Sequence, residues 1–167
     1  MKQKIETNDN EKISAGILFV KNKKILLCHV TGKNHWDIPK GQRNEGEDYI
    51  DAAIRECQEE TGYTPLKEDL RPLGIVSYNR FKSLALFLYT GENHPLSYQC
   101  KCTSMTDDGY PEVDDFEYFP LTEVSDYTVE SLRKAIFNSL KEFYPNDVNI
   151  SDYLDTRESK INYQNKR

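Results

Sequence analysis

The sequence lacks the features that mark several large classes of protein. No apolar run is long enough to cross a bilayer, and the N-terminal MKQKIETNDNEK has no hydrophobic stretch that could act as a secretory signal. We therefore expect a cytoplasmic protein with no membrane partner. Its four cysteines include no C-x-x-C pair, so we expect reduced thiols rather than a zinc site or a disulfide framework.

Positive charge and histidine are also scarce. The chain has 22 Lys and Arg against 28 Asp and Glu, for a formal net charge of -6. This balance disfavours nucleic-acid binding through a large basic surface, although a few local positive charges could still hold a small anion. Only three histidines are present, and no motif pairs one with a cysteine, which argues against a catalytic Cys–His pair.

What remains is the composition of one ordinary folded domain. A chain of 167 residues with 37% hydrophobic residues is long enough to bury a core and short for two domains. We expect a polar N-terminal segment over 1–12 and a domain over 13–145. Residues 146–167 are predicted to be a polar tail or a short docking helix.

Runs of β-branched and aliphatic residues predict most of the strands. Residues 13–20 and 24–30 are expected to form a hairpin around the polar turn Lys21-Asn22-Lys23. Residues 35–40 should be extended, because Pro39 keeps the preceding residue out of helical geometry. Later strands are predicted at 73–78 and 83–90, with weaker signals at 96–103 and 116–119.

Helical periodicity appears in two places. In residues 48–61 the apolar side chains recur at spacings of three and four, and Gly62 follows as a typical C-terminal cap. Residues 128–143 show the same periodicity at Val129, Leu132, Ala135, Ile136, Leu140 and Phe143. Pro145 should end this second helix.

The first helix ends in a cluster of like charges. Glu56, Glu59 and Glu60 are three, four and one residues apart, so their carboxylates gather on one side of the last turns. Like charges on a helix destabilise it unless a cation is bound, and Mg²⁺ prefers hard oxygen ligands of this kind. The plain alternative is a solvated, glutamate-rich helix face.

The wider pattern favours the chemical interpretation. Gly41, Glu47, Arg55-Glu56, Glu59-Glu60 and Gly62 have the spacing of the Nudix box, with Cys57 and Tyr63 in its two apolar positions. The chain from about Ile13 to about Pro145 thus resembles the Nudix hydrolases. The resemblance implies an α/β/α sandwich with a mixed β-sheet, and magnesium-dependent hydrolysis of a phosphoanhydride, with Mn²⁺ as a substitute for Mg²⁺.

The same resemblance assigns roles to residues. Glu56, Glu59 and Glu60 are expected to bind metal, Glu47 and Arg55 to form a supporting ion pair, and Gly41 to shape the loop that faces the metal. Glu112 matches a loop that supplies a further metal ligand or a general base in many members, or is simply a surface glutamate. We place Glu56 ahead of Glu112 as the base. Lys40 is grouped with the metal site as well as with the substrate.

Substrate preference is less directly encoded. Trp36 followed by Pro-Lys-Gly and later Gly-Glu resembles most closely the diadenosine tetraphosphate hydrolases. In that interpretation Lys40 and Arg43 meet bridging phosphates, while Trp36 is more readily explained as core. Further candidates are Tyr78 and Tyr89 for stacking and Arg80 and Lys82 for phosphate, although core packing and a polar turn explain them equally well.

Other functions stay open at this point. Related Trp-x-x-Pro-Lys-Gly sequences occur in RNA 5′-pyrophosphohydrolases, messenger-RNA decapping enzymes and diphosphoinositol phosphatases. The RNA enzymes would favour a basic channel, and a diphosphoinositol substrate would need more lysines and arginines than this chain places near the box. A non-catalytic nucleotide sensor with the same fold is the alternative from a different class, although such modules usually lose box glutamates.

Overall fold

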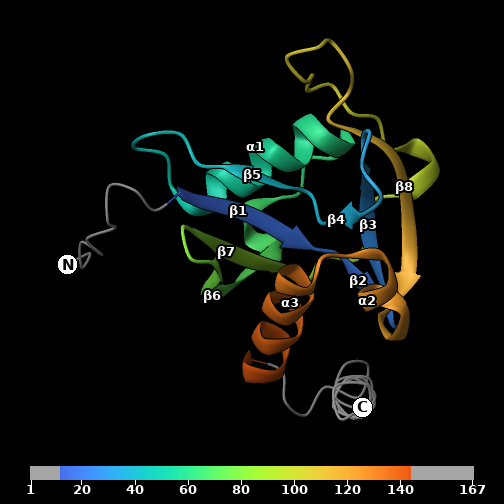
Figure 1. The fold of residues 1–167 in the computed structure, drawn as a ribbon. Coiled ribbons are helices and arrows are strands. Elements are labelled where there is room, and N and C mark those ends of the chain that lie inside the picture. The colour runs from blue at the N-terminus through green and yellow to red at the C-terminus, as the bar shows by residue number, and fades with distance from the viewer. Residues whose placement is uncertain (1–11, 144–167) are drawn as a thin grey trace.

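The computed structural model describes residues 12–143, with helices and strands that follow most of the predicted pattern (Figure 1). The predicted segment 1–12, apart from Lys12, and the tail 146–167 lie outside the described residues, as does Pro145. The strands are β1 (Lys12–Leu18), β2 (Val20–Lys21), β3 (Lys24–Val30), β4 (Trp36–Asp37), β5 (Lys40–Gln42), β6 (Leu70–Asn79), β7 (Lys82–Tyr89) and β8 (Val113–Pro120). The α-helices are α1 (Tyr49–Thr61), α2 (Val124–Tyr127) and α3 (Glu130–Phe143), and short 3-10 turns lie at Lys67–Asp69, Ser97–Gln99 and Leu121–Glu123.

The strands form two sheets. The first sheet has the order β5-β1-β7-β6, with β1 parallel to β7 and the other pairs antiparallel. The second sheet has the order β2-β3-β4, with β8 also pairing to β3, and is antiparallel throughout. The mixed pairing and the helices on both sides confirm the predicted α/β fold class.

The predicted hairpin over 13–20 and 24–30 is only partly correct. The chain leaves its strand conformation at Phe19, so β1 enters the first sheet while the short β2 pairs with β3 in the second. The turn itself is where it was expected, with Asn22 and Lys23 at φ angles of 51° and 64°. A strand's residue pattern reveals its exposed and buried faces but not which neighbour it pairs with, which is why β1 was misassigned.

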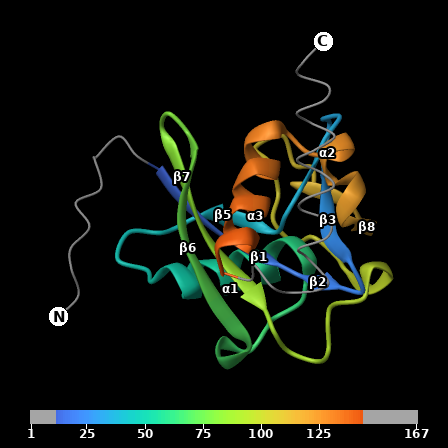
Figure 2. The same ribbon diagram turned by 90° about the horizontal axis from the view of Figure 1, so that it is seen from below.

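Alternation of side chains along the strands builds a core on each side of the first sheet. Ile13, Ala15 and Ile17 of β1 point to one face and pack against Ala52, Ala53 and Cys57 of α1. Leu84 and Leu86 of β7 point to the other face, where Leu132, Ile136 and Leu140 of α3 cover them. The two views show α1 and α3 on opposite faces of this sheet, as the predicted sandwich requires (Figure 1 and Figure 2).

The second long helix is shorter than its predicted range. Thr128 ends α2 and Val129 lies before α3, where its side chain is 36% exposed rather than part of the apolar face. The rest of the predicted face that the structure describes is buried: Leu132, Ala135, Ile136 and Leu140. Within residues 12–143, no helix combines the length and the apolar character needed to span a membrane.

Residues 96–103 do not form the predicted strand. They contain a 3-10 turn at Ser97–Gln99, and the segment then runs past the C-terminus of α1. There Lys101 and Thr103 donate their backbone N–H groups to the carbonyls of Thr61 and Glu59, at 2.9 and 2.7 Å. Helix α1 therefore takes the backbone hydrogen bonds that a sheet would otherwise have provided.

Candidate active site

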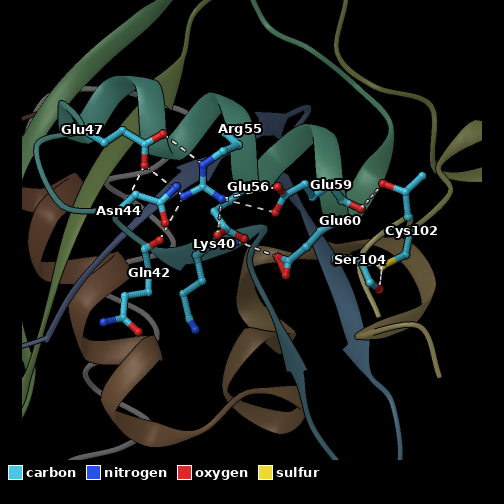
Figure 3. Close-up of polar contacts among 11 residues, drawn as sticks. Lys40, Gln42, Asn44, Glu47, Arg55, Glu56, Glu59, Glu60, Cys102 and Ser104 are labelled. Atoms are coloured by element: carbon cyan, nitrogen blue, oxygen red, sulfur yellow. Dashed lines mark hydrogen bonds and ion pairs between the residues drawn. The ribbon is translucent and has the colours of Figure 1, made fainter. Parts of the chain in front are cut away.

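Helix α1 carries the predicted carboxylates on its underside, facing β5 (Figure 3). Glu56 and Glu60 are buried, with 9% and 6% of their surface exposed, whereas the Glu59 side chain is 39% exposed. The helix ends directly after them, because Gly62 adopts a φ of 78° and its N–H bonds the carbonyl of Gln58. Three glutamates are thus held on the last two turns of a rigid helix.

Arg55 fixes these carboxylates from one side. Its Nε and Nη2 donate to the two carboxylate oxygens of Glu47, both at 3.0 Å, in a bidentate pair. Its Nη1 donates to Oε1 of Glu56 at 2.8 Å and lies 3.4 Å from both oxygens of Glu59. The Arg55 hydrogen bond holds the pKa of Glu47 below its usual range. The structure therefore brings together the predicted ion pair and two of the glutamates.

The loop before α1 is tied to the same arginine. Nη2 of Arg55 donates to the carbonyl of Gln42 at 3.0 Å, and the backbone N–H of Asn44 donates to Oε1 of Glu47 at 3.1 Å. Arg43 donates through Nη1 to the carbonyl of Glu47 at 3.1 Å, while its guanidinium lies 5.0 Å from the ring centre of Tyr49. Arg43 thus helps to hold the loop, and its expected contact with phosphate stays a prediction.

Gly41 lies in close contact with the carboxylate of Glu56. A Cβ atom built on Gly41 would fall 2.0 Å from Cδ and from Oε2 of Glu56, a distance that no real side chain tolerates. Any side chain at this position would push the Glu56 carboxylate out of its place beside β5. This gives a physical reason for the glycine at the start of the box motif, since it leaves room for the Glu56 carboxylate beside the loop.

Glu60 points into the protein beneath β5. Its Oε1 accepts the backbone N–H of Lys40 at 2.9 Å, so one hydrogen bond joins the last turn of the helix to the strand. Burial raises the pKa of Glu60 well above its ordinary range, the Lys40 N–H opposes the shift, and the charge of Asp37 adds to it. A carboxylate in this position is poorly solvated and gains from a nearby cation.

The pKa of Glu56 is also raised. Burial is the main cause, Arg55 opposes it, and the negative charges of Glu59 and Glu112 add to the shift. The effect of Glu112 shows that its carboxylate acts on the same cluster, although it comes from the loop before β8. The structure therefore brings Glu112 to the edge of the box glutamates, and its role as ligand or base stays a prediction.

Comparison with known proteins now decides the family. A family model described as the NUDIX domain matches residues 10–145, which include all of the described structure. The chain is a Nudix hydrolase. A curated relative in Enterobacteria phage T4, an uncharacterized 17.7 kDa protein in the e-segB intergenic region, is 39% identical over 126 residues, covering 66% of this chain and 83% of its own.

Two further proteins are similar to this Nudix hydrolase. The RNA pyrophosphohydrolase of Pelagibacter ubique is 24% identical over 126 residues, covering 66% of this chain and 74% of its own. The crystal structure of a MutT/nudix family protein from Enterococcus faecalis superimposes with a TM-score of 0.62 at 16% identity, covering 91% of this chain and 70% of that one. The fold and the pyrophosphohydrolase chemistry are therefore established, whereas the preference for a dinucleoside polyphosphate stays a prediction.

Sequence reasoning missed a partly buried ion pair in this Nudix hydrolase. Nζ of Lys40 lies 3.0 Å from Oδ2 of Asp37, and both side chains are about one fifth exposed, at 21% and 18%. Burial alone would lower the pKa of Lys40, but the Asp37 carboxylate outweighs it and the pKa is raised. The ammonium thus stays protonated and has no lone pair for a metal, which corrects the placing of Lys40 among the metal ligands.

The carboxylates of the Nudix box are suited to a divalent cation by their chemistry. Within residues 12–143, no three His, Cys, Asp or Glu side chains already stand together as a metal-binding group. One cause is Arg55, whose Nη1 lies against both Glu56 and Glu59. The donor set nevertheless consists of hard oxygens, and two of its three carboxylates are buried. Burial, with a smaller contribution from neighbouring carboxylates, raises the pKa of Glu56 and Glu60. These residues therefore fit Mg²⁺.

The predicted substrate residues divide into two groups. Lys40, Tyr78 and Lys82 line a common cavity of about 120 Å³, with the Lys40 ammonium 5.7 Å from the ring centre of Tyr78. Tyr89 belongs to the core on the α1 side, where its hydroxyl meets Tyr63 at 2.9 Å, so it is not the stacking residue that the sequence suggested. Arg80 is exposed in the turn after β6 and lies against the ring of Phe81.

Proposed function

We propose that this Nudix hydrolase uses Mg²⁺ to cleave a phosphoanhydride in a dinucleoside polyphosphate. One observation carries the metal assignment. Glu56 and Glu60 are buried side by side with Glu59 at the end of α1, and only Arg55 among the described cations donates a side-chain hydrogen bond to them. A buried cluster with more carboxylates than cations is destabilising unless a further cation balances it.

The residues of the chain supply distinct parts of the reaction. Glu56, Glu59 and Glu60 would hold the metal, which when bound polarises the phosphoryl group and neutralises the charge that develops on it. Arg55 keeps Glu56 in place, and Glu47 keeps Arg55 in place. A water molecule attacks an inner phosphorus, the bond from that phosphorus to the bridging oxygen breaks, and a nucleotide leaves.

Glu56 is the first candidate to take the proton from the attacking water. Its raised pKa makes it a stronger base than an ordinary glutamate, and its carboxylate is positioned by Arg55. Glu112 is the second candidate, because its charge reaches the same cluster.

The phosphate chain is expected to lie along the cavity formed by Lys40, Tyr78 and Lys82. Lys40 is protonated and Lys82 is exposed at the start of β7, so the two ammonium groups offer positive charge beside an aromatic ring. A compact ammonium suits the oxygens of a polyphosphate. These residues are suited to a polyphosphate chain, but they do not indicate which groups the chain carries at its two ends.

An RNA 5′ end is the second candidate substrate. The observation in its favour is the similarity to the RNA pyrophosphohydrolase of Pelagibacter ubique, whose name states its substrate class. Against it stands the net charge of -6, which provides little phosphate-neutralising surface for a longer RNA. The two candidates share the same chemistry at the phosphoanhydride.

A substrate panel tests the proposal. Purified protein with Mg²⁺ would be given dinucleoside tetraphosphates, ADP-ribose, nucleoside triphosphates, a diphosphoinositol phosphate, and 5′-triphosphorylated and capped RNA, with products separated by chromatography. We expect fastest conversion of a dinucleoside tetraphosphate to a nucleoside triphosphate and monophosphate. Faster turnover of an RNA end would retain the chemistry and replace the substrate. Binding without turnover of any compound would indicate a nucleotide sensor.

A further inference from the structure

An aromatic and acidic hollow lies beside the candidate active site, on the second sheet. In the register of β3, His29 lies opposite Trp36 of β4 on one side and opposite Asp115 of β8 on the other. Residues directly opposite one another on antiparallel strands place their side chains on the same face. These three side chains therefore form a row across β4, β3 and β8, which lie next to each other in Figure 1.

A β-bulge adds a second carboxylate to this row. His29 pairs with Asp115 and Val30 pairs with Val113, so Asp114 is an extra residue in β8 with no partner in the register. In a regular strand Asp114 and Asp115 would point to opposite faces. The bulge turns both into the same hollow, where Asp114 contacts Nδ1 of His29. Bulges often re-aim a side chain in this way beside functional sites.

The hollow is open to solvent and combines an aromatic wall with two exposed carboxylates. It measures about 500 Å³ and is lined by His29, Trp36, Asp114 and Asp115. The Trp36 ring is held edge-to-face between His29 and Phe119, with ring centres 5.2 and 4.9 Å away, so the aromatic wall is fixed by packing. Small-molecule sites commonly measure 300–1,000 Å³ and combine aromatic walls with a few placed polar groups.

The position of the hollow connects it to the phosphoanhydride site. Trp36 directly precedes Asp37, which binds Lys40 at the phosphate cavity. On the other side, Asp114 follows two residues after Glu112, whose charge acts on Glu56. A nucleotide with its phosphates near Lys40 and the glutamates would therefore have its base within reach of this hollow.

The two carboxylates restrict which part of a nucleotide fits there. Oδ1 of Asp114 is engaged by His29, and Oδ1 of Asp115 accepts the backbone N–H of Phe116 at 2.8 Å. The second oxygen of each carboxylate accepts no hydrogen bond from the described residues. These oxygens are acceptors only, so they repel phosphate and favour a ligand with neighbouring N–H donors.

We infer that this hollow binds a guanine base of the nucleotide substrate. Guanine presents its N1–H and its 2-amino group side by side, and both donate to carboxylate oxygens, while its flat ring stacks on an aromatic wall. Adenine offers only its 6-amino group on that edge and turns the acceptor N1 toward the carboxylates. The inference deepens the proposed function on which it rests, and shifts the expected dinucleoside polyphosphate from adenine to guanine.

Trp36 is the only tryptophan of the chain and provides a direct binding probe. GMP and AMP would be titrated into the full-length protein without metal while tryptophan fluorescence is recorded. We expect quenching by GMP at a concentration about tenfold or more below that needed for AMP, since each charge-assisted hydrogen bond contributes on the order of 1.5–3 kcal/mol. Equal quenching by both, or no quenching by GMP, would overturn the guanine site.

Asp115→Asn tests the carboxylate and Asp108→Asn is its matched control. The amide loses one acceptor oxygen and gains an N–H group that opposes the guanine donors, so the GMP preference should disappear. Asp108 is also an exposed aspartate but lies outside the hollow, and its variant should keep the wild-type preference. An Asp115→Asn protein that retained the full preference for GMP would contradict the inference.

Turnover separates this inference from the proposed function. With Mg²⁺, kcat/KM would be compared for diguanosine and diadenosine tetraphosphate in the wild-type and Asp115→Asn proteins. We expect the diguanosine compound to be favoured about tenfold or more, and the preference to be lost in the variant. Equal rates for both substrates would overturn the guanine site and retain the hydrolase. GMP-selective quenching with neither compound hydrolysed would retain the site and overturn the proposed substrate.

Discussion

Single residues in this site are constrained by contact as much as by charge. Gly41 must lack a side chain because the Glu56 carboxylate occupies the space where a Cβ would lie. Glu47 takes no part in metal binding in our account and acts through its bidentate bond to Arg55. The motif therefore contains two kinds of residue. Some are proposed to carry out the chemistry, and the others hold those residues in position.

Gly41→Ala tests the contact with Glu56. The new methyl group would displace either the carboxylate or β5, and an error of about 1 Å in a reacting group commonly lowers a rate by about 100-fold. We expect kcat/KM for a dinucleoside tetraphosphate to fall by about 100-fold or more while the circular dichroism spectrum is retained. Gly109→Ala has open space around its Cβ position and meets only the backbone strain of a φ of 85°, so it should retain activity and serves as the control for a strained glycine replacement. Wild-type turnover by Gly41→Ala would contradict the packing argument.

At this scale the sequence predicts some groups far better than others. The box glutamates and Arg55 were identified because helix geometry fixes the relative positions of residues three and four apart. The Asp37–Lys40 ion pair was missed, since it depends on the bend between β4 and β5. The two aspartates of the hollow received no role from the sequence, because a bulge that turns Asp114 has no reliable sequence signal.

At the scale of elements, helix α1 is supported at its C-terminus by distant segments. Residues 101–104 donate to the carbonyls of Thr61 and Glu59, and the preceding loop is attached to β2 through His94. Nε2 of His94 lies 3.1 Å from the carbonyl oxygen of Val20, and the ring centres of His94 and Tyr89 are 4.8 Å apart. Sequence periodicity located α1 correctly but mistook part of this supporting loop for a strand.

His94 should make this part of the fold sensitive to acid. Burial lowers its pKa, the hydrogen bond to Val20 opposes the shift, and the charge of Lys21 adds to the lowering. Because the unfolded chain binds a proton more readily, the stabilising contribution is complete above the ordinary histidine pKa of about 6.5 and is lost as pH falls below it.

Thermal unfolding at two pH values checks this expectation. Between about pH 8 and about pH 5, the Tm of the wild type should fall further than that of His94→Gln, which keeps a donor for Val20 but does not titrate. His35→Gln serves as the control, because no bond of this kind ties His35 to the loop, and it should follow the wild type. A His94→Gln protein with an unchanged pH dependence would refute the assignment.

At the scale of the whole molecule, the two sheets and the helices on either side of the first sheet carry the box motif and the two surfaces that we propose for substrate binding. The cavity proposed for phosphate is lined by residues of the first sheet, the aromatic and acidic hollow by residues of the second, and the glutamates of α1 face β5. The α/β/α arrangement was predictable from strand and helix patterns and from the box motif. The division into two sheets could not be predicted, because it depends on β1 pairing with β7 while the short β2 pairs with β3.

The most direct test of the central claim is the Mg²⁺ dependence of hydrolysis in wild type, Glu59→Gln and Glu45→Gln proteins. Glu59 is the most accessible box carboxylate, and Glu45 is an exposed glutamate of the preceding loop outside the cluster. We predict that wild type and Glu45→Gln hydrolyse a dinucleoside tetraphosphate only with Mg²⁺, and that Glu59→Gln loses about 100-fold or more in kcat. Undiminished turnover by Glu59→Gln, or turnover in excess chelator, would contradict the account.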